Sequence, residues 1–123
     1  MHLNHLDLSV PDVDRAEHLF RTLFGFVRLR RNATTGHAVL VGDGGFVLVL
    51  SPTEGGAPAA YPPAFHIGFH VDDPAALDDL YARVQAEGLA VVHPLGPAAF
   101  GGGTAFYCRG PGEIMIELAH RPG

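Results

Sequence analysis

The sequence has very little cysteine, which excludes one way of stabilising a small fold. Its single cysteine, Cys108, cannot form an internal disulfide, and a lone thiol suits a reducing cytoplasm. Cys108 also lacks an activating pattern around it, so we interpret it as a small core residue rather than a nucleophile. Neither end shows a basic leader, a long apolar run or a lipidation signal. We therefore expect a cytoplasmic protein without a membrane partner.

Basic residues are also scarce. The chain has 13 acidic and 8 basic side chains, a formal net charge of −5, which argues against a nucleic-acid partner. The one local exception is the group Arg28, Arg30 and Arg31, which we interpret as a solvated face or as a guard on an edge strand. Hydrophobic residues make up 47% of the 123 residues, enough to predict one globular domain.

Two histidines stand four positions apart in the segment FHIGFHVDD, residues 65–73. Apolar and polar residues alternate along it, which predicts a half-buried strand rather than a helix. A strand rises about 3.3 Å per residue, so His66 and His70 lie roughly 13 Å apart and cannot bind one ion together. If His66 is a metal ligand, its partners come from other strands.

The chain repeats one pattern twice. Residues 5–10, HLDLSV, and 66–71, HIGFHV, both begin with histidine, end with valine and carry apolar residues on one parity only. An acidic turn, an amphipathic helical pattern and three strand-like segments follow each of them. The sequence therefore predicts an α+β fold of two βαβββ modules in a single domain. Module one spans residues 1–51, a linker rich in proline, glycine and alanine spans 52–63, and module two spans 64–123.

The boundaries of the two predicted helices are marked by aspartate and glycine. Asp12 or Asp14 in the first module, and Asp73 in the second, are candidate N-caps. The helical patterns stop at Gly25 and Gly88, as a left-handed C-cap requires.

This order of elements resembles the vicinal oxygen chelate superfamily, which includes glyoxalase I, extradiol dioxygenases, and fosfomycin- and bleomycin-resistance proteins. The similar segments are residues 4–26 (NHLDLSVPDVDRAEHLFRTLFGF), 65–73 and 106–118 (FYCRGPGEIMIEL). The resemblance implies that the curved mixed sheets of the two modules form a cavity for a metal or ligand. It also implies a homodimer, with the modules paired within one chain or between two.

The resemblance further implies that His5, His66 and Glu117 are metal ligands. Aligning the two halves places His5 opposite His66 and Val49 opposite Glu117, so the chain offers two histidines and one carboxylate. Imidazole and carboxylate suit a divalent Fe, Mn, Ni, Co or Zn ion, and three ligands leave positions open for a small oxygen-rich substrate. The competing interpretation is a hydrogen-bonded or surface role for each histidine, and a solvated strand face for Glu117.

Other polar residues share the parity of these histidines. His70 is the best candidate for proton transfer, since free imidazole titrates at about pH 6.5, although a structural hydrogen bond would explain it equally well. Asp7 and Ser9 would line the same cavity. Tyr107 and Arg109 precede Glu117 and either contact an anionic or phenolic ligand or serve packing and surface roles.

The segment PLGPAAFGGGT, residues 94–104, combines three glycines with Phe100. It is either a mobile flap that closes on a ligand, with Phe100 as an apolar wall, or simply a long hairpin loop.

Two classes of function follow. The first is a metal-dependent enzyme of the glyoxalase or dioxygenase type, a lyase, isomerase or ring-cleaving dioxygenase, with Glu117 and His70 as catalytic candidates. The second is a non-catalytic protein that binds a small molecule or an antibiotic, as bleomycin-resistance proteins do. Retention of all three ligand positions favours the enzyme.

Overall fold

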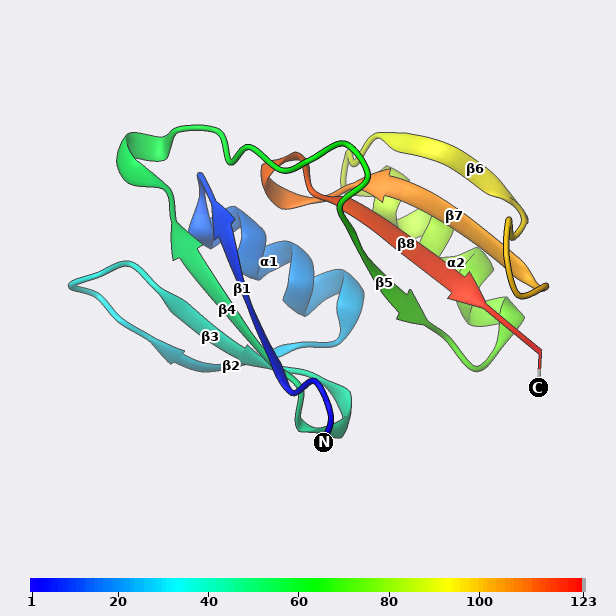
Figure 1. Cartoon of the computed structure of the whole chain (residues 1–123), viewed down its shortest axis with the longest axis horizontal. Coiled ribbons are helices and arrows are strands. Elements are labelled where there is room, and N and C mark those ends of the chain that lie inside the picture. Colours follow the sequence, from blue (N-terminus) through cyan, green and yellow to red (C-terminus); the bar gives the residue numbers. More distant parts are fainter. Residues whose placement is uncertain (123) are drawn as a thin grey trace. The chain divides into compact units, whose positions relative to one another are not determined.

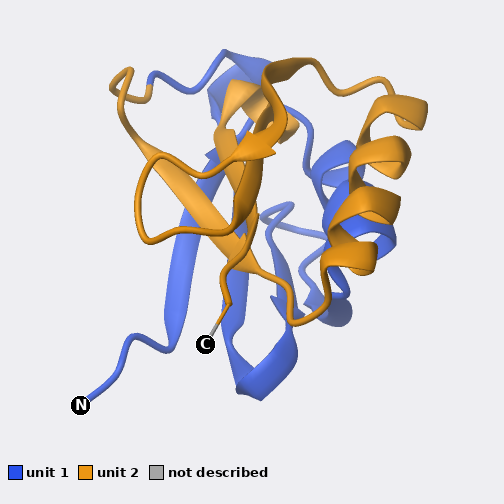
Figure 2. Cartoon of the chain, turned by 90° about the vertical axis from the view of Figure 1, so that its right-hand side faces the viewer, with its two compact units in different colours: residues 1–60 blue, residues 61–123 orange. Residues whose placement is uncertain are grey.

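The structure is a computed structural model that describes residues 1–122. The chain divides into two compact units, residues 1–60 and residues from Tyr61 onward, coloured separately in Figure 2. Each unit contains one helix and one four-stranded mixed sheet in the order βαβββ (Figure 1). The predicted α+β fold of two repeated modules is confirmed. No helix in residues 1–122 is long and apolar enough to cross a bilayer.

The first unit follows the repeat closely. Its elements are β1 (His5–Val10), α1 (Val13–Phe24), β2 (Val27–Arg31), β3 (Ala38–Val41) and β4 (Val47–Pro52). The strand order is β1-β4-β3-β2, in which β1 runs parallel to β4 and the other pairs are antiparallel. The short 3-10 turns Asp43–Gly45 and Glu54–Gly56 flank β4.

The second unit repeats this topology. Its elements are β5 (His66–His70), α2 (Pro74–Ala86), β6 (Val91–Pro97), β7 (Thr104–Arg109) and β8 (Met115–His120), with a 3-10 turn at Pro111–Glu113. The order β5-β8-β7-β6 again pairs the first and last strands in parallel. The two edge strands of each sheet are thus the first strand of the unit and the strand that follows the helix.

Three of the four helix caps are the residues predicted from the sequence, and the fourth differs by one position. Asp12, not Asp14, caps α1, and Asp73 caps α2, each accepting a bond from a backbone N–H of the first turn. Gly25 ends α1 in the left-handed conformation, with φ of 72°. The C-cap of α2 is Glu87 in a right-handed conformation, and Gly88 (φ 82°) follows it as the left-handed residue.

One face of each sheet packs against the helix of its own unit. Buried side chains on this face and on the helix include Leu8, Leu48, Leu50, Leu19 and Phe20 in the first unit, and Phe106, Ile116, Leu118, Leu77 and Val84 in the second. Cys108 belongs to the second core, and burial raises the pKa of its thiol to about 11. The thiolate is therefore scarce at neutral pH, which confirms the interpretation of Cys108 as a core residue.

The strand register supports the internal alignment residue by residue. In the first unit His5 pairs with Val47, so Val49 is the residue two positions beyond that partner. In the second unit His66 pairs with Met115, and Glu117 is again two positions beyond. Val49 and Glu117 therefore occupy equivalent places, as the alignment of the two halves predicted.

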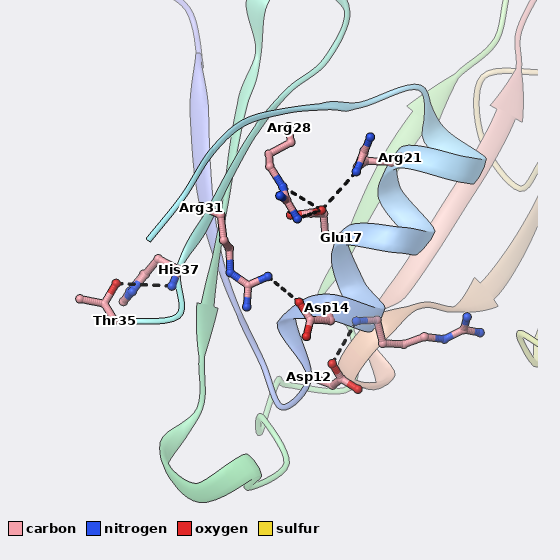
Figure 3. Close-up of polar contacts among 9 residues, drawn as sticks. Asp12, Asp14, Glu17, Arg21, Arg28, Arg31, Thr35 and His37 are labelled. Atoms are coloured by element: carbon pink, nitrogen blue, oxygen red, sulfur yellow. Dashed lines mark hydrogen bonds and ion pairs between the residues drawn. The ribbon is translucent and has the colours of Figure 1, made fainter. Parts of the chain in front are cut away.

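The edge strand β2 is held to α1 by ion pairs (Figure 3). Glu17, 5% exposed, accepts three bonds from Arg28 at 2.7–3.0 Å and one from Arg21 at 3.3 Å. Arg31 donates to Asp14 at 2.6 Å. The edge position predicted for the arginine group is confirmed, and two of its members also fasten the strand to the helix.

Candidate functional site

The face of the second sheet that points away from α2 carries a row of polar residues. Ile116 and Leu118 are buried on the helix side, so alternation along β8 places Glu117 on the opposite face. Glu117 pairs with Tyr107 of β7, and Tyr107 pairs with His93 of β6. The row crosses three neighbouring strands, from the inner strands β8 and β7 to the edge strand β6.

Glu117 is 9% exposed, and both of its carboxylate oxygens have partners within the unit. The hydroxyl of Tyr107 donates to Oε2, and Nη2 of Arg121 donates to Oε1 at 3.4 Å. An unpaired buried carboxylate would carry a large energetic penalty and would favour a bound cation. Tyr107 and Arg121 remove that penalty, so burial alone does not require a metal at Glu117.

The position of His66 is nevertheless suited to a metal ligand. Its Nδ1 lies 3.0 Å from the carbonyl oxygen of Ala64. Because a carbonyl only accepts, Nδ1 carries a proton, and in the neutral ring Nε2 is then the nitrogen with the lone pair. Nε2 lies 4.0 Å from Oε2 of Glu117. Two atoms bound to one ion at about 2.0–2.2 Å lie about 3.0–3.4 Å apart, so a small side-chain shift would bring both atoms onto an ion.

His5 has the same ring arrangement in the first unit. Its Nδ1 lies 2.6 Å from Oδ1 of Asn4, which leaves Nε2 as the available nitrogen. In metal-bound histidines, the ring nitrogen that does not bind the metal commonly makes a hydrogen bond of this kind. The bond fixes the tautomer and the orientation of the ring. His5 and the pair His66–Glu117 belong to units that are described separately, and within residues 1–122 no three histidine, cysteine or acidic side chains form a metal-binding cluster. The trio therefore stays a prediction.

Tyr107 connects the polar residues of this face. Its ring contacts His66 on one side, with centroids 5.8 Å apart, and His93 on the other, at 5.3 Å, both edge to face. The hydrogen bond to Glu117, and partial burial, raise the pKa of Tyr107. Tyr107 therefore remains a protonated donor at neutral pH. Sequence reasoning gave greater weight to a packing or surface role for this residue.

His93 and Arg121 are the residues that sequence reasoning missed. His93 has no counterpart in the histidine repeat, and its neighbour Tyr107 becomes evident only from the pairing of β6 with β7. Arg121 lies beyond the last strand, where no motif marks it. The spacing of four residues from Glu117 is a weak signal, because β8 ends at His120 and helical spacing rules do not apply there.

A pocket of about 430 Å³ lies beside His66 within the second unit. Its polar lining residues are His66, His93 and Tyr107, and its apolar lining residues include Pro94, Pro97, Ala98, Ala99 and Met115. This volume is within the range of small-molecule sites, about 300–1,000 Å³. The second unit alone thus provides a pocket whose lining combines hydrogen-bonding groups with apolar side chains.

The remaining candidates lie near this face but contact the pocket less directly. His70 shares the face of β5 with His66, pairs with Ala119 and is exposed. Arg109 donates to the backbone carbonyl of Glu113 at 3.3 Å and so braces the turn before β8. Phe100 is 82% exposed, and the residues of its loop that line the pocket are its alanine neighbours.

Comparison with protein families gives a match over nearly the whole chain. The model of the Glyoxalase/Bleomycin resistance protein/Dioxygenase superfamily matches residues 2–118. A curated protein of Pseudomonas aeruginosa, described as uncharacterized, is 31% identical over 128 residues, which cover 96% of this chain and 87% of the relative.

Solved structures with the same fold include proteins of two descriptions. A possible glyoxalase from Bacillus cereus is 28% identical, with a TM-score of 0.80 over 97% of this chain and 98% of that one. A fosfomycin resistance protein from Listeria monocytogenes is 18% identical, with a TM-score of 0.79 over 99% of this chain and 94% of that one. At that identity the second likeness concerns the fold alone.

Proposed function

Because the chain belongs to the Glyoxalase/Bleomycin resistance protein/Dioxygenase superfamily, we propose that it is a divalent-metal-dependent enzyme acting on a small oxygen-rich substrate. His5, His66 and Glu117 are the proposed ligands, and Fe, Mn, Ni, Co and Zn are the ions that such a set suits. The reaction class is that of a lyase, an isomerase or a ring-cleaving dioxygenase.

One observation carries the proposal. His66 donates from Nδ1 to a backbone carbonyl and turns Nε2 toward the carboxylate of Glu117. Histidines that only support a fold use either nitrogen, whereas a ligand needs one nitrogen fixed as donor and the other unprotonated. The adjacent carboxylate supplies the anionic oxygen that balances part of a divalent charge.

The residues of the chain have distinct roles in this proposal. When bound, the ion would act as a Lewis acid on a carbonyl or enolate oxygen, or would activate dioxygen if it were iron. Tyr107 holds one oxygen of Glu117 and so fixes the carboxylate plane. The pocket beside His66 receives the carbon skeleton of the substrate against its apolar lining residues. His70, further along the same strand face, moves a proton to or from the substrate.

The first test is metal content by plasma mass spectrometry after reconstitution with Fe(II), Mn(II), Ni(II) and Zn(II). We expect near-stoichiometric metal in the wild type and loss of metal in Glu117→Gln and His66→Ala. Matched controls are Glu113→Gln, which removes the preceding acid on the same side of the hairpin, and His70→Ala, which removes the other histidine of β5. Equal metal loss in a control and in its partner variant would refute the ligand assignment.

Sequestration of a small molecule without catalysis is the second candidate function. It is favoured by one observation, namely that Tyr107 and Arg121 already satisfy Glu117, which leaves the pocket complete without an ion. A wild-type protein that resists loading with all four metals but still binds small apolar molecules would favour this function over the enzyme.

We also propose a homodimer. A chain with two βαβββ units joined by residues 52–63 can pair its units internally or with those of a second copy. Sedimentation at micromolar concentration should give the mass of a dimer, and a monomer would remove this part of the proposal.

A further inference from the structure

Each unit carries one carboxylate at the same level of its parallel strand pair, but on different strands. In the second unit Glu117 of β8 pairs with Gly68 of β5. At the equivalent level of the first unit Val49 of β4 pairs with Asp7 of β1. The carboxylate that Val49 lacks is therefore present on the neighbouring strand, directly across the ladder.

Asp7 faces the same side of its sheet as His5. Leu8 is 1% exposed and packs toward α1, so alternation along β1 turns Asp7 and His5 to the opposite face. Their Cα atoms are about 6.6 Å apart along a strand, two residues at about 3.3 Å each. Two side chains at this spacing on one face can bind a single ion, in contrast to the pair His66 and His70 in β5.

The carboxylate of Asp7 is oriented but not fully used. Oγ of Ser51 donates to its Oδ1 at 2.5 Å. Among residues 1–122 no hydrogen bond or ion pair engages Oδ2. This is the arrangement expected for a ligand, with one oxygen held by a supporting hydroxyl and the other open. Glu117, by comparison, has a partner on each oxygen.

We propose that Asp7 is a metal ligand beside His5, on the same face of β1. It binds the same ion as His5. From β1 it supplies the carboxylate that an acidic residue at position 49 of β4 would otherwise supply. This inference rests on the proposed function, because it requires that the protein binds a divalent ion. It changes the ligands that the first unit supplies from one histidine to one histidine and one carboxylate, whose negative charge balances part of the divalent charge.

In this proposal the carboxylate has moved from position 49 of β4 to position 7 of β1. This exchange between strands can be tested by introducing the residues of the second unit at the equivalent positions of the first. The variants are Asp7→Gly, Val49→Glu and the double variant Asp7→Gly with Val49→Glu, which reproduces the pair formed by Gly68 and Glu117. Mn(II) and Zn(II) affinities are measured by competition with a chromogenic chelator. Asp43→Asn, an acid in a turn of the same unit, controls for loss of one negative charge, and circular dichroism verifies folding.

We expect Asp7→Gly to weaken affinity by about ten- to hundred-fold, the range found when groups around a metal are removed, and Asp43→Asn to change it by less than about twofold. The double variant should recover most of the loss. An unchanged affinity in Asp7→Gly, or an equal loss in Asp43→Asn, would overturn the assignment. A loss in Asp7→Gly that the double variant does not recover would overturn the exchange between strands. If the wild type binds no metal, the proposed function itself fails, which the loading experiment detects separately.

Discussion

The two units share one backbone plan but arrange polar residues differently along the same row of their sheets. In the first unit this row reads Asp7, Val49, Val39 and Arg30 across β1, β4, β3 and β2. In the second it reads Gly68, Glu117, Tyr107 and His93 across β5, β8, β7 and β6. In the first row the polar side chains lie on the two edge strands, β1 and β2; in the second they lie on the inner strands β8 and β7 and on the edge strand β6. The repeated fold thus gives both units the same backbone positions, while the residue at each position determines which strand carries the polar side chains.

The units also differ in how the helix is tied to the edge strand. In the first unit Glu17 binds Arg28 at 2.7 Å. In the second, Asp78 stands at the helix position of Glu17, and Val91 stands at the strand position of Arg28. In the second helix, Asp79 and Arg83 form an exposed pair at 3.9 Å. An ion pair therefore supports the outer strand β2 of the first unit, whereas the second unit has the apolar side chain of Val91 at the equivalent position.

The largest expected effect on stability concerns the loop that joins β2 to β3 in the first unit and β6 to β7 in the second. Gly103 in the second unit has φ of 79°, and a Cβ there would lie 2.1 Å from the carbonyl oxygen of His120. Gly36, in the corresponding loop of the first unit, has φ of 81° but a nearest contact of 3.4 Å. Gly103→Ala should cost about 3 kcal/mol or more, and Gly36→Ala only the backbone strain of about 1–2 kcal/mol.

Urea unfolding of the two glycine variants measures this difference. Gly102→Ala is the internal control, because it has φ of 72° and open space around the added Cβ. If Gly103→Ala and Gly102→Ala cost the same, the loop does not pack tightly against His120, and the contrast between the units is lost.

The second expected effect concerns the ion pair of the first unit. Glu17→Ala removes a buried carboxylate that accepts from Arg28 and Arg21. Because Arg28 is about half exposed, water screens the pair, and we expect a loss of about 1 kcal/mol rather than the larger cost of a fully buried pair. Asp79→Ala in the second unit should cost at most about 0.5 kcal/mol. Chemical denaturation of both variants measures the contrast, and equal losses would show that Glu17 has no special role.

The same pair gives a pH dependence of defined sign. Hydrogen bonds from Arg28, and its charge, hold the pKa of Glu17 below the ordinary value of 4.5. The pair therefore stabilises the folded state fully above pH 4.5, and this stabilisation is lost as the pH falls through the lowered pKa. The difference in unfolding free energy between the wild type and Glu17→Gln should shrink as the pH is lowered below 4.5. A constant difference between pH 3 and pH 7, in about the range where carboxylates titrate, would contradict this.

Much of this architecture could be predicted from the sequence because its signals are local. Alternation fixed the strand that contains His66, and Asp73 marked the start of its helix. Residues that act through pairing across strands could not be predicted in this way. His93 meets Tyr107 only because β6 contains register shifts, and Arg121 reaches Glu117 from beyond the strand. The exchange of a carboxylate between positions 7 and 49 likewise depends on a parallel ladder, which no single segment reveals.

The smallest expected effect tests the inner polar row of the second unit. Tyr107→Phe removes the hydroxyl that donates to Glu117 and leaves the ring contacts with His66 and His93 in place. The loss should be about 1 kcal/mol or less, since Arg121 still neutralises the carboxylate. The corresponding residue of the first unit is Val39, which has no hydroxyl to remove.

Tyr81→Phe is the matched control for this variant. Tyr81 packs edge to face on Phe106 in the core of the same unit, at 4.9 Å between centroids, and its hydroxyl donates no hydrogen bond among residues 1–122. Thermal unfolding should therefore show a decrease for Tyr107→Phe and none for Tyr81→Phe. Metal affinity separates the two functions proposed for the site: if Tyr107 positions a ligand, Tyr107→Phe also weakens metal binding, by less than Glu117→Gln does. If the hydroxyl only satisfies a buried carboxylate, stability falls and metal affinity stays constant.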